Sequence, residues 1–260
     1  LLETHISWVL LTGQYAYKIK KPVNLGFLDF SSMSKRRHYC LEEIRLNRRL
    51  APEYYLEVVP ITGTAQEPQV NGTGNAMEFA VKMRQFPRHA EFNQLLKRGP
   101  FEPDICTQLA QKVAQFHNDI EIAAADRPCG DAATVHLPAL DNFNLLKKQK
   151  LHTHDLNLLH HIETWTTNFI NRYHDTFVER KNQGFIRECH GDLHLNNIAW
   201  VDNAPLIFDC IEFSEQLRWI DVISEVAFLA MDFQEQGYPL LASLFLFHHM
   251  MYHLILLGVF

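Results

Sequence analysis

Alternation of apolar and polar side chains marks two short runs at the start of the chain. Ile6 to Leu11 and Tyr15 to Lys20 are rich in apolar residues, and Thr12-Gly13-Gln14 separates them. Two such runs around a glycine-containing turn predict a β-hairpin. Because successive strand residues point to opposite faces, the second run has one aromatic-rich face (Tyr15, Tyr17 and Ile19) and one lysine-bearing face (Ala16, Lys18 and Lys20).

After this hairpin, the apolar residues recur at the spacing of an α-helix. A helix is predicted from about Ser34, taken as the N-cap, to Leu50, where Ala51-Pro52 stops it. Two further strands are predicted at Glu57 to Ile61 and Met77 to Arg84, on either side of a turn rich in Gly and Asn. The chain up to residue 86 is therefore expected to be a small sheet with one helix.

Helical spacing dominates the rest of the chain. Helices are predicted at about Pro103 to Ile120 and Asp155 to Asn182, while Ala123 to Asn144 is expected to be irregular. We therefore predict an α+β protein of two lobes, residues 1–86 for nucleotide binding and residues 87–260, mainly helical, for catalysis and substrate binding.

A second hairpin carries the chemically informative residues. Ile198 to Val201 and Leu206 to Phe208 are apolar runs joined by the turn-forming segment 202–205. Asn197 stands just before the first run and Asp209 just after the second, so antiparallel pairing brings them side by side. Asp192 lies on the loop that leads in. Three oxygen-bearing side chains are thus expected at one rim of a small sheet.

Phosphoryl transfer requires such a set. One carboxylate accepts the proton of the attacking hydroxyl, while a second carboxylate and an amide oxygen hold Mg²⁺, which prefers oxygen ligands. The order His-x-Asp-x-x-x-x-Asn, then strand, turn, strand and Asp, is the arrangement of kinases. It makes Asp192 and His190 the candidate catalytic residues and Asn197 and Asp209 the candidate metal ligands.

The first hairpin and the helix supply the matching upstream pair. Tyr15-Ala16-Tyr17-Lys18 fits the pattern of a strand lysine that binds nucleotide phosphates, and Ala16 leaves room for an adenine. Glu43 lies on the apolar stripe of the helix, whereas Glu42 lies on the polar side. A carboxylate on a buried stripe requires a partner, so we predict that Glu43 and Lys18 pair in the cleft. Lys20 and Lys21 are expected to be surface charges.

Residues 3–59 and 187–232 resemble the phosphotransferase-like half of bacterial bifunctional aminoglycoside phosphotransferase/ATP-binding proteins. The resemblance implies a kinase-like fold that binds ATP and Mg²⁺ and phosphorylates a hydroxyl of a small molecule. It also implies ATP at a hinge near Met83, Asp192 as base, and Asp221 as a structural acid supporting the catalytic loop. The blocks that carry it are Thr4-His5-Ile6-Ser7-Trp8-Val9, Tyr17-Lys18-Ile19-Lys20-Lys21-Pro22-Val23, Phe27-Leu28-Asp29-Phe30, Asn47-Arg48-Arg49-Leu50-Ala51-Pro52, Glu188-Cys189-His190-Gly191-Asp192-Leu193-His194 and Phe208-Asp209-Cys210-Ile211-Glu212-Phe213.

The chain departs from that pattern in two respects. It contains no P-loop, although relatives of this family continue into a P-loop kinase-like half, which would be a partner domain absent from this chain. It also has no Gly-x-Gly-x-x-Gly before Lys18. Either a covering strand and loop precede Leu1, or polar groups such as Thr4, His5 and Ser7 take the place of the glycine-rich cover.

Alternatives to a kinase remain open. His190, Asp192 and His194 have the spacing of a zinc site, which would favour a hydrolase. The missing glycine loop would suit a pseudokinase-like nucleotide-binding or regulatory module. The apolar stretch Leu240 to Phe260 is nearly long enough to span a membrane, but three histidines interrupt it, so a buried C-terminal helix and no membrane partner are expected.

Composition narrows the classes further. A net charge of −6 argues against a nucleic-acid partner, because binding to phosphate backbones needs a concentrated positive surface. Five widely spaced cysteines with no Cys-x-x-Cys pair are typical of a reducing compartment. The first residues lack the pattern of a signal peptide, so a cytoplasmic protein is expected.

Overall fold

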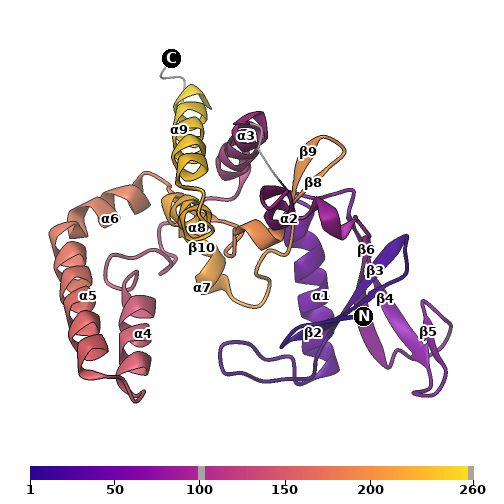
Figure 1. Cartoon of the computed structure of the whole chain (residues 1–260). Coiled ribbons are helices and arrows are strands. Elements are labelled where there is room, and N and C mark those ends of the chain that lie inside the picture. The colour runs from indigo at the N-terminus through magenta and orange to yellow at the C-terminus, as the bar shows by residue number, and fades with distance from the viewer. Residues whose placement is uncertain (99–102, 257–260) are drawn as a thin grey trace. The chain divides into compact units, whose positions relative to one another are not determined.

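The computed structural model describes residues 1–98 and 103–256, which fall into two compact units. The first unit combines Leu1–Asp119, His190–Arg218 and Ile223–Phe260, and the second combines Ile120–Cys189 and Trp219–Val222. An antiparallel sheet with helices confirms the predicted α+β class (Figure 1). The lobe boundary near residue 86 stays a prediction, since the chain on both sides of it belongs to the first unit.

The main sheet of the first unit has six strands in the order β1-β2-β3-β6-β4-β5, and every adjacent pair is antiparallel. The predicted first hairpin is present, with Leu11 opposite Ala16 and Ser7 opposite Lys20. The short edge strand β5 was not predicted, because its three exposed residues have no apolar alternation. The strands are β1 (Leu2–Glu3), β2 (Ser7–Leu11), β3 (Tyr15–Lys20), β4 (Tyr55–Gly63), β5 (Pro68–Val70) and β6 (Glu78–Arg84).

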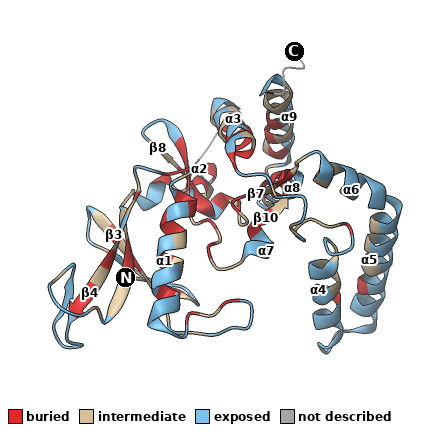
Figure 2. Cartoon of the chain, turned by 180° about the vertical axis from the view of Figure 1, so that it is seen from behind, coloured by how far each residue is buried: buried red, intermediate tan, exposed pale blue. Residues whose placement is uncertain are grey.

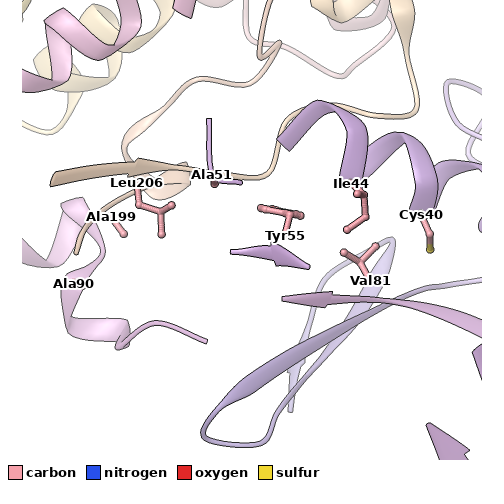
Figure 3. Close-up of a cluster of buried hydrophobic side chains, with 8 residues drawn as sticks. All are labelled: Cys40, Ile44, Ala51, Tyr55, Val81, Ala90, Ala199 and Leu206. Carbon is pink, nitrogen blue, oxygen red and sulfur yellow. The ribbon is translucent and has the colours of Figure 1, made fainter. Parts of the chain in front are cut away.

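Helix α1 (Met33–Asn47) packs against β4 and β6. Its N-cap is Ser32, not the predicted Ser34: Ser32 has an extended backbone, and its hydroxyl accepts the backbone N–H of Lys35. Figure 3 shows a buried cluster that joins this helix and the sheet to a second hairpin. The cluster comprises Cys40, Ile44, Ala51, Tyr55, Val81, Ala90, Ala199 and Leu206.

That second hairpin, β8 (Ile198–Val201) with β9 (Ala204–Ile207), confirms the prediction. Asp202 and Asn203 both have positive φ, as a tight two-residue hairpin turn requires. Helix α3 (Pro103–Asp119) agrees with its predicted bounds and packs against α9. The remaining short elements of the first unit are η1 (Arg88–Ala90), α2 (Phe92–Leu96), η2 (Leu195–Asn197), α7 (Glu215–Arg218) and α8 (Val222–Glu235); Val222 itself is counted with the second unit.

The C-terminal helix α9 (Pro239–Leu256) is buried on one face only. Ala242, Phe245 and His249 are buried, whereas Leu240 and Phe247 are exposed. Within residues 1–98 and 103–256, α9 alone is long and apolar enough to cross a membrane, and 17% of that stretch is buried. The expected burial therefore holds for part of the helix, and residues 257–260 of the predicted stretch lie outside the described residues.

The second unit holds α4 (Leu137–Lys147), α5 (Thr153–Arg172), α6 (His174–Asn182) and the pair β7 (Ile186–Glu188) with β10 (Trp219–Asp221). Two predictions are corrected here. The segment from Ala123 to Asn144 was predicted to be irregular, but its last part belongs to α4. Pro138 fits in the first turn of this helix, because the N–H that proline lacks is unpaired there anyway. The single helix predicted for 155–182 is broken at Tyr173, whose ψ of 18° leaves the helical region. Figure 2 shows that α5 and α6 are mostly exposed.

The position of the helix cap can be tested by a pair of substitutions. Ser32→Ala removes the side-chain acceptor for an N-terminal N–H of α1 and is expected to lower the free energy of unfolding by about 1 kcal/mol. Ser34→Ala lies inside α1 and is expected to be neutral or slightly stabilising, since alanine is the better helix former. Urea denaturation of both variants measures this, and the reverse order would return the cap to Ser34.

Candidate active site

A cavity of about 550 Å³ opens in the first unit between the sheet and the β8–β9 hairpin. Ala16 and Met83, both predicted to contact a nucleotide, line it and are register partners on β3 and β6. Leu206 and Phe208 of the hairpin line it too, so this part of the wall is apolar. Lys18, Asp192 and Asp209 line it as well and place charged groups in a wall that is otherwise mainly apolar.

Lys18 lies between two carboxylates. Its Nζ is 2.9 Å from Glu43 Oε1 and also donates a hydrogen bond to Asp209. The prediction that Lys18 lies beside Asp209 and that Glu43 approaches it is therefore confirmed. Glu43 is fully buried, whereas Glu42 is partly exposed, pairs with Arg45 and lies 3.8 Å from Arg218. Strand alternation could not separate Lys18 from Lys20; Ala16, two residues before Lys18, selected the lysine, and the apolar stripe of the helix selected Glu43.

Lys20 corrects a prediction, because it is buried and not a surface charge. Its Nζ lies 2.6 Å from Glu43 Oε2 and also pairs with Glu212. Lys20 shares the inward face of β3 with Lys18, so the same alternation could have placed it inside. Glu212 was missed because it follows the second hairpin and belongs to no regular element. Lys21, on the opposite face, pairs with the exposed Glu3.

Two buried cations and three carboxylates thus form one network, the Lys18–Lys20 cluster: Lys18, Lys20, Glu43, Asp209 and Glu212. Burial by itself lowers the pKa of Lys18, but Asp209 and Glu43 outweigh it, so its pKa lies well above the ordinary value. Burial would raise the pKa of Asp209, yet Lys18 holds it below its usual range. Both groups are therefore charged at neutral pH.

The backbone around Asp209 is fixed by two side chains that sequence reasoning missed. Asp209 has a φ of 66°, and its N–H donates to the Tyr55 hydroxyl at 3.1 Å. The N–H of Cys210 donates to Asn47 Oδ1 at 2.9 Å. Both residues are buried. Asn47 follows Glu43 by four residues and so shares its face of α1, and this position could have identified it, because buried polar groups need partners.

Asp192 lies in the cavity wall and is partly exposed, with 40% of its side chain accessible. Asn197 Nδ2 donates to the backbone oxygen of Asp192 at 3.0 Å and to its carboxylate at 3.2 Å. Partial burial favours the neutral acid, but His194 and Asn197 stabilise the carboxylate more strongly, so the pKa of Asp192 is lowered. Asp192 is thus an ionised acceptor facing the cavity.

His190, predicted as a catalytic residue, is completely buried. Its Nε2 lies 2.9 Å from the backbone oxygen of Phe208, and its Nδ1 accepts the N–H of Asp192 at 3.2 Å. It therefore connects the loop of Asp192 to the strand end that carries Asp209. Because both ring nitrogens bond to backbone atoms, His190 does not converge with His194 on a zinc site. With these contacts, His190 can hold the backbone of the Asp192 loop in position.

Two carboxylates of α8 accept backbone N–H groups of the loop that carries Asp192, and the sequence singled out neither: Asp232 accepts the N–H of Leu195 at 2.7 Å, and Glu225 bonds nearer Asp192. Glu225 Oε1 accepts the N–H of Gly191 at 2.7 Å, and its Oε2 lies 2.8 Å from His117 Nε2. Asp221, which was expected to support this loop, makes a two-pronged ion pair with Arg180 in the second unit. Gly191 has a φ of +85°, and a Cβ there would lie 2.8 Å from the backbone oxygen of Leu217.

Asn197 and Asp209, the predicted metal ligands, provide oxygen donors on either side of the β8–β9 hairpin. Asn197 directly precedes β8, Asp209 follows β9, and the backbone N–H of Phe208 donates to the backbone oxygen of Asn197 at 3.0 Å. Carboxylate and amide oxygens are the ligands that Mg²⁺ accepts in proteins. The types of donor therefore suit a hard divalent cation, but of the two only Asp209 lines the cavity; Asn197 is buried and is not among the lining residues.

Comparisons with known proteins do not assign a function to this chain. No family model matches the chain. The uncharacterized proteins Mb2027c of Mycobacterium bovis and Rv2004c of Mycobacterium tuberculosis are each 29% identical over 244 residues, which is 94% of this chain and 47% of theirs. The chain thus spans about half the length of the curated relatives it matches. An ethanolamine kinase of Plasmodium vivax has a TM-score of 0.43 and 13% identity, covering 91% of this chain and 61% of that chain.

The two neighbouring glutamates of α1 give a test of the buried network. Glu43→Gln leaves Lys18 and Lys20 buried with one carboxylate fewer, and a loss of about 3–5 kcal/mol in the free energy of unfolding is expected. Glu42→Gln weakens the partly exposed pair with Arg45 and a 3.8 Å contact with Arg218, which keeps Glu215 nearby, and should cost less than about 1 kcal/mol. Equal losses for the two variants in urea denaturation would contradict this account.

Proposed function

We propose that the chain is a phosphotransferase that uses ATP and Mg²⁺ to phosphorylate a hydroxyl of a small molecule. The observation that carries the proposal is the position of Lys18, paired with Glu43 and Asp209 in the wall of a cavity that Asp192 also lines. A lysine held by a helix glutamate, a hydroxyl-facing aspartate and a second aspartate beside the lysine are the groups that phosphoryl transfer from a nucleotide requires.

Lys18 binds phosphate oxygens in this proposal, and Glu43 keeps it in place. Lys18 remains protonated when buried because the neighbouring carboxylates raise its pKa. Ala16 and Met83 provide the flat apolar wall for the base. The nucleotide is thereby oriented with its base at the Ala16 end of β3 and its phosphates at the Lys18 end.

Asp192 accepts the proton of the acceptor hydroxyl. Its carboxylate is ionised, partly exposed and held by His194 and Asn197. His190 and Glu225 act through the backbone of the same loop and are positioning residues. Asn197 and Asp209 would hold Mg²⁺, which when bound neutralises charge on the phosphates.

Asp192→Asn tests the assignment of the base. The substitution keeps the size and hydrogen bonding of the side chain but removes its ability to accept a proton, so the rate of phosphoryl transfer is expected to fall about 10²–10⁴-fold. The affinity for ATP should stay nearly unchanged, because the base acts on the acceptor. An ATP-consumption screen over hydroxyl compounds, with ATP binding measured by calorimetry, provides both values.

Two outcomes would contradict the proposal. Normal turnover by Asp192→Asn would remove Asp192 from the mechanism. Binding of ATP by the unaltered chain with no transfer to any hydroxyl compound would favour the regulatory, pseudokinase-like module instead.

The metal site is tested through its dependence on nucleotide. Mg²⁺ keeps most of its waters and relies on phosphate oxygens, so Mg²⁺ alone should not raise the melting temperature, whereas Mg²⁺ with ATP should raise it above ATP alone. Asp209→Asn should abolish this additional rise. Asp202→Asn is the matched control, because Asp202 also has positive φ but lies at the far turn of the same hairpin. Loss of the rise in both variants would refute the assignment of Asp209.

A further inference from the structure

One face of the β2–β3 hairpin changes from apolar to polar along its length. Directly opposed residues share a face of the sheet, and the pairs on the cavity face are Leu11 with Ala16, Val9 with Lys18 and Ser7 with Lys20. Ser7, Val9, Leu11, Ala16 and Lys18 all line the cavity. Ser7 thus stands at the charged end of this face, where Lys18 and Lys20 bring two cations.

The turn from Thr4 to Ser7, which joins β1 to β2, closes this end of the cavity. Thr4 and Ser7 line the cavity, and Ser7 is 1% exposed. Thr4 Oγ1 accepts the backbone N–H groups of Ile6 at 3.3 Å and of Ser7 at 2.9 Å. The N–H of Thr4 donates to the backbone oxygen of Ser7 at 2.9 Å. A hydroxyl thus ties the turn together from within.

These bonds determine which donors the turn can offer to a ligand. A glycine-rich loop presents free backbone N–H groups to phosphates, but the N–H groups of Thr4, Ile6 and Ser7 are all bonded inside this turn. The hydroxyls of Thr4 and Ser7 lie 2.8 Å apart and either can donate to the other, and the Thr4 hydroxyl also lies 3.3 Å from the Ser7 backbone oxygen. When Thr4 donates to the Ser7 hydroxyl, Ser7 keeps its own hydrogen, which can be directed into the cavity.

We propose that Ser7 donates its hydroxyl hydrogen to the phosphate chain of the bound nucleotide, and that Thr4 holds the turn so that Ser7 faces the phosphates. The inference rests on the proposed function and adds a phosphate-binding residue to it. In this assignment a serine hydroxyl contacts the phosphates, where other kinases use the backbone of a glycine-rich loop. Ser7 is a binding residue in this assignment, and Thr4 is a positioning residue.

Comparing ATP with adenosine isolates this contact. Ser7→Ala should weaken binding of ATP with Mg²⁺ by about tenfold, the effect of one hydrogen bond to a charged group, and leave the affinity for adenosine unchanged. Thr4→Val should reproduce this selective loss, and Thr4→Ser, which keeps the hydroxyl, should restore most of the affinity. Thr12→Val is the matched control, because the Thr12 hydroxyl closes the neighbouring β2–β3 turn outside the cavity wall.

The possible results separate this inference from the proposed function. Unaltered affinity of Ser7→Ala for ATP would overturn the role of Ser7 while the phosphotransferase proposal stands. Parallel losses for ATP and adenosine would also overturn it, because they would show that Ser7 only maintains the turn. Failure of the unaltered chain to bind ATP would refute the proposed function, and the inference with it.

Discussion

A fully buried carboxylate, Glu43, is the constraint on which the rest of the site depends. It faces Lys18 and Lys20 at 2.9 and 2.6 Å, so two strand cations share one helix anion. Burying any of these charges alone would cost several kcal/mol, and only close pairing offsets that cost. The network therefore fixes the distance and the rotation of α1 relative to β3, because a shifted helix would remove the carboxylate that both buried lysines share and leave each with one partner, Asp209 or Glu212.

The second hairpin is tied to the same two elements by neutral hydrogen bonds. Asn47, one turn beyond Glu43 on α1, accepts the N–H of Cys210, and Tyr55 of β4 accepts the N–H of Asp209. The Asn47 amide also donates to the backbone oxygen of Glu43 at 2.9 Å. The helix thus positions the lysine through Glu43 and the aspartate through Asn47. A proposed phosphate-binding group and a proposed metal ligand are thereby held by adjacent turns of one helix.

Sequence reasoning found the residues whose positions follow from periodicity and missed those defined by tertiary partners. Alternation on β3 together with Ala16, and the stripe on α1, selected Lys18 and Glu43, and the spacing around the second hairpin selected Asp192, Asn197 and Asp209. Lys20 was misassigned because alternation cannot tell which inward lysine has a partner until Glu212, far along the chain, is placed. Glu225 contacts Gly191 across 34 residues and has no local signal. The cap at Ser32 was missed by two residues, since either serine fits the local pattern.

The charge balance of the Lys18–Lys20 cluster bears on how nucleotide and metal would bind. Its two lysines face three carboxylates (Glu43, Asp209 and Glu212), so the cluster has no net positive charge even with Glu212 neutral, the form that burial favours by raising its pKa. A polyphosphate that competes with Asp209 for Lys18 would leave the Asp209 carboxylate without its cation. Because an unpaired, partly buried carboxylate is costly, phosphate binding and recruitment of a replacement cation at Asp209 are thermodynamically linked. In the proposed function, the ion pair between Lys18 and Asp209 would thus couple the binding of nucleotide to that of metal.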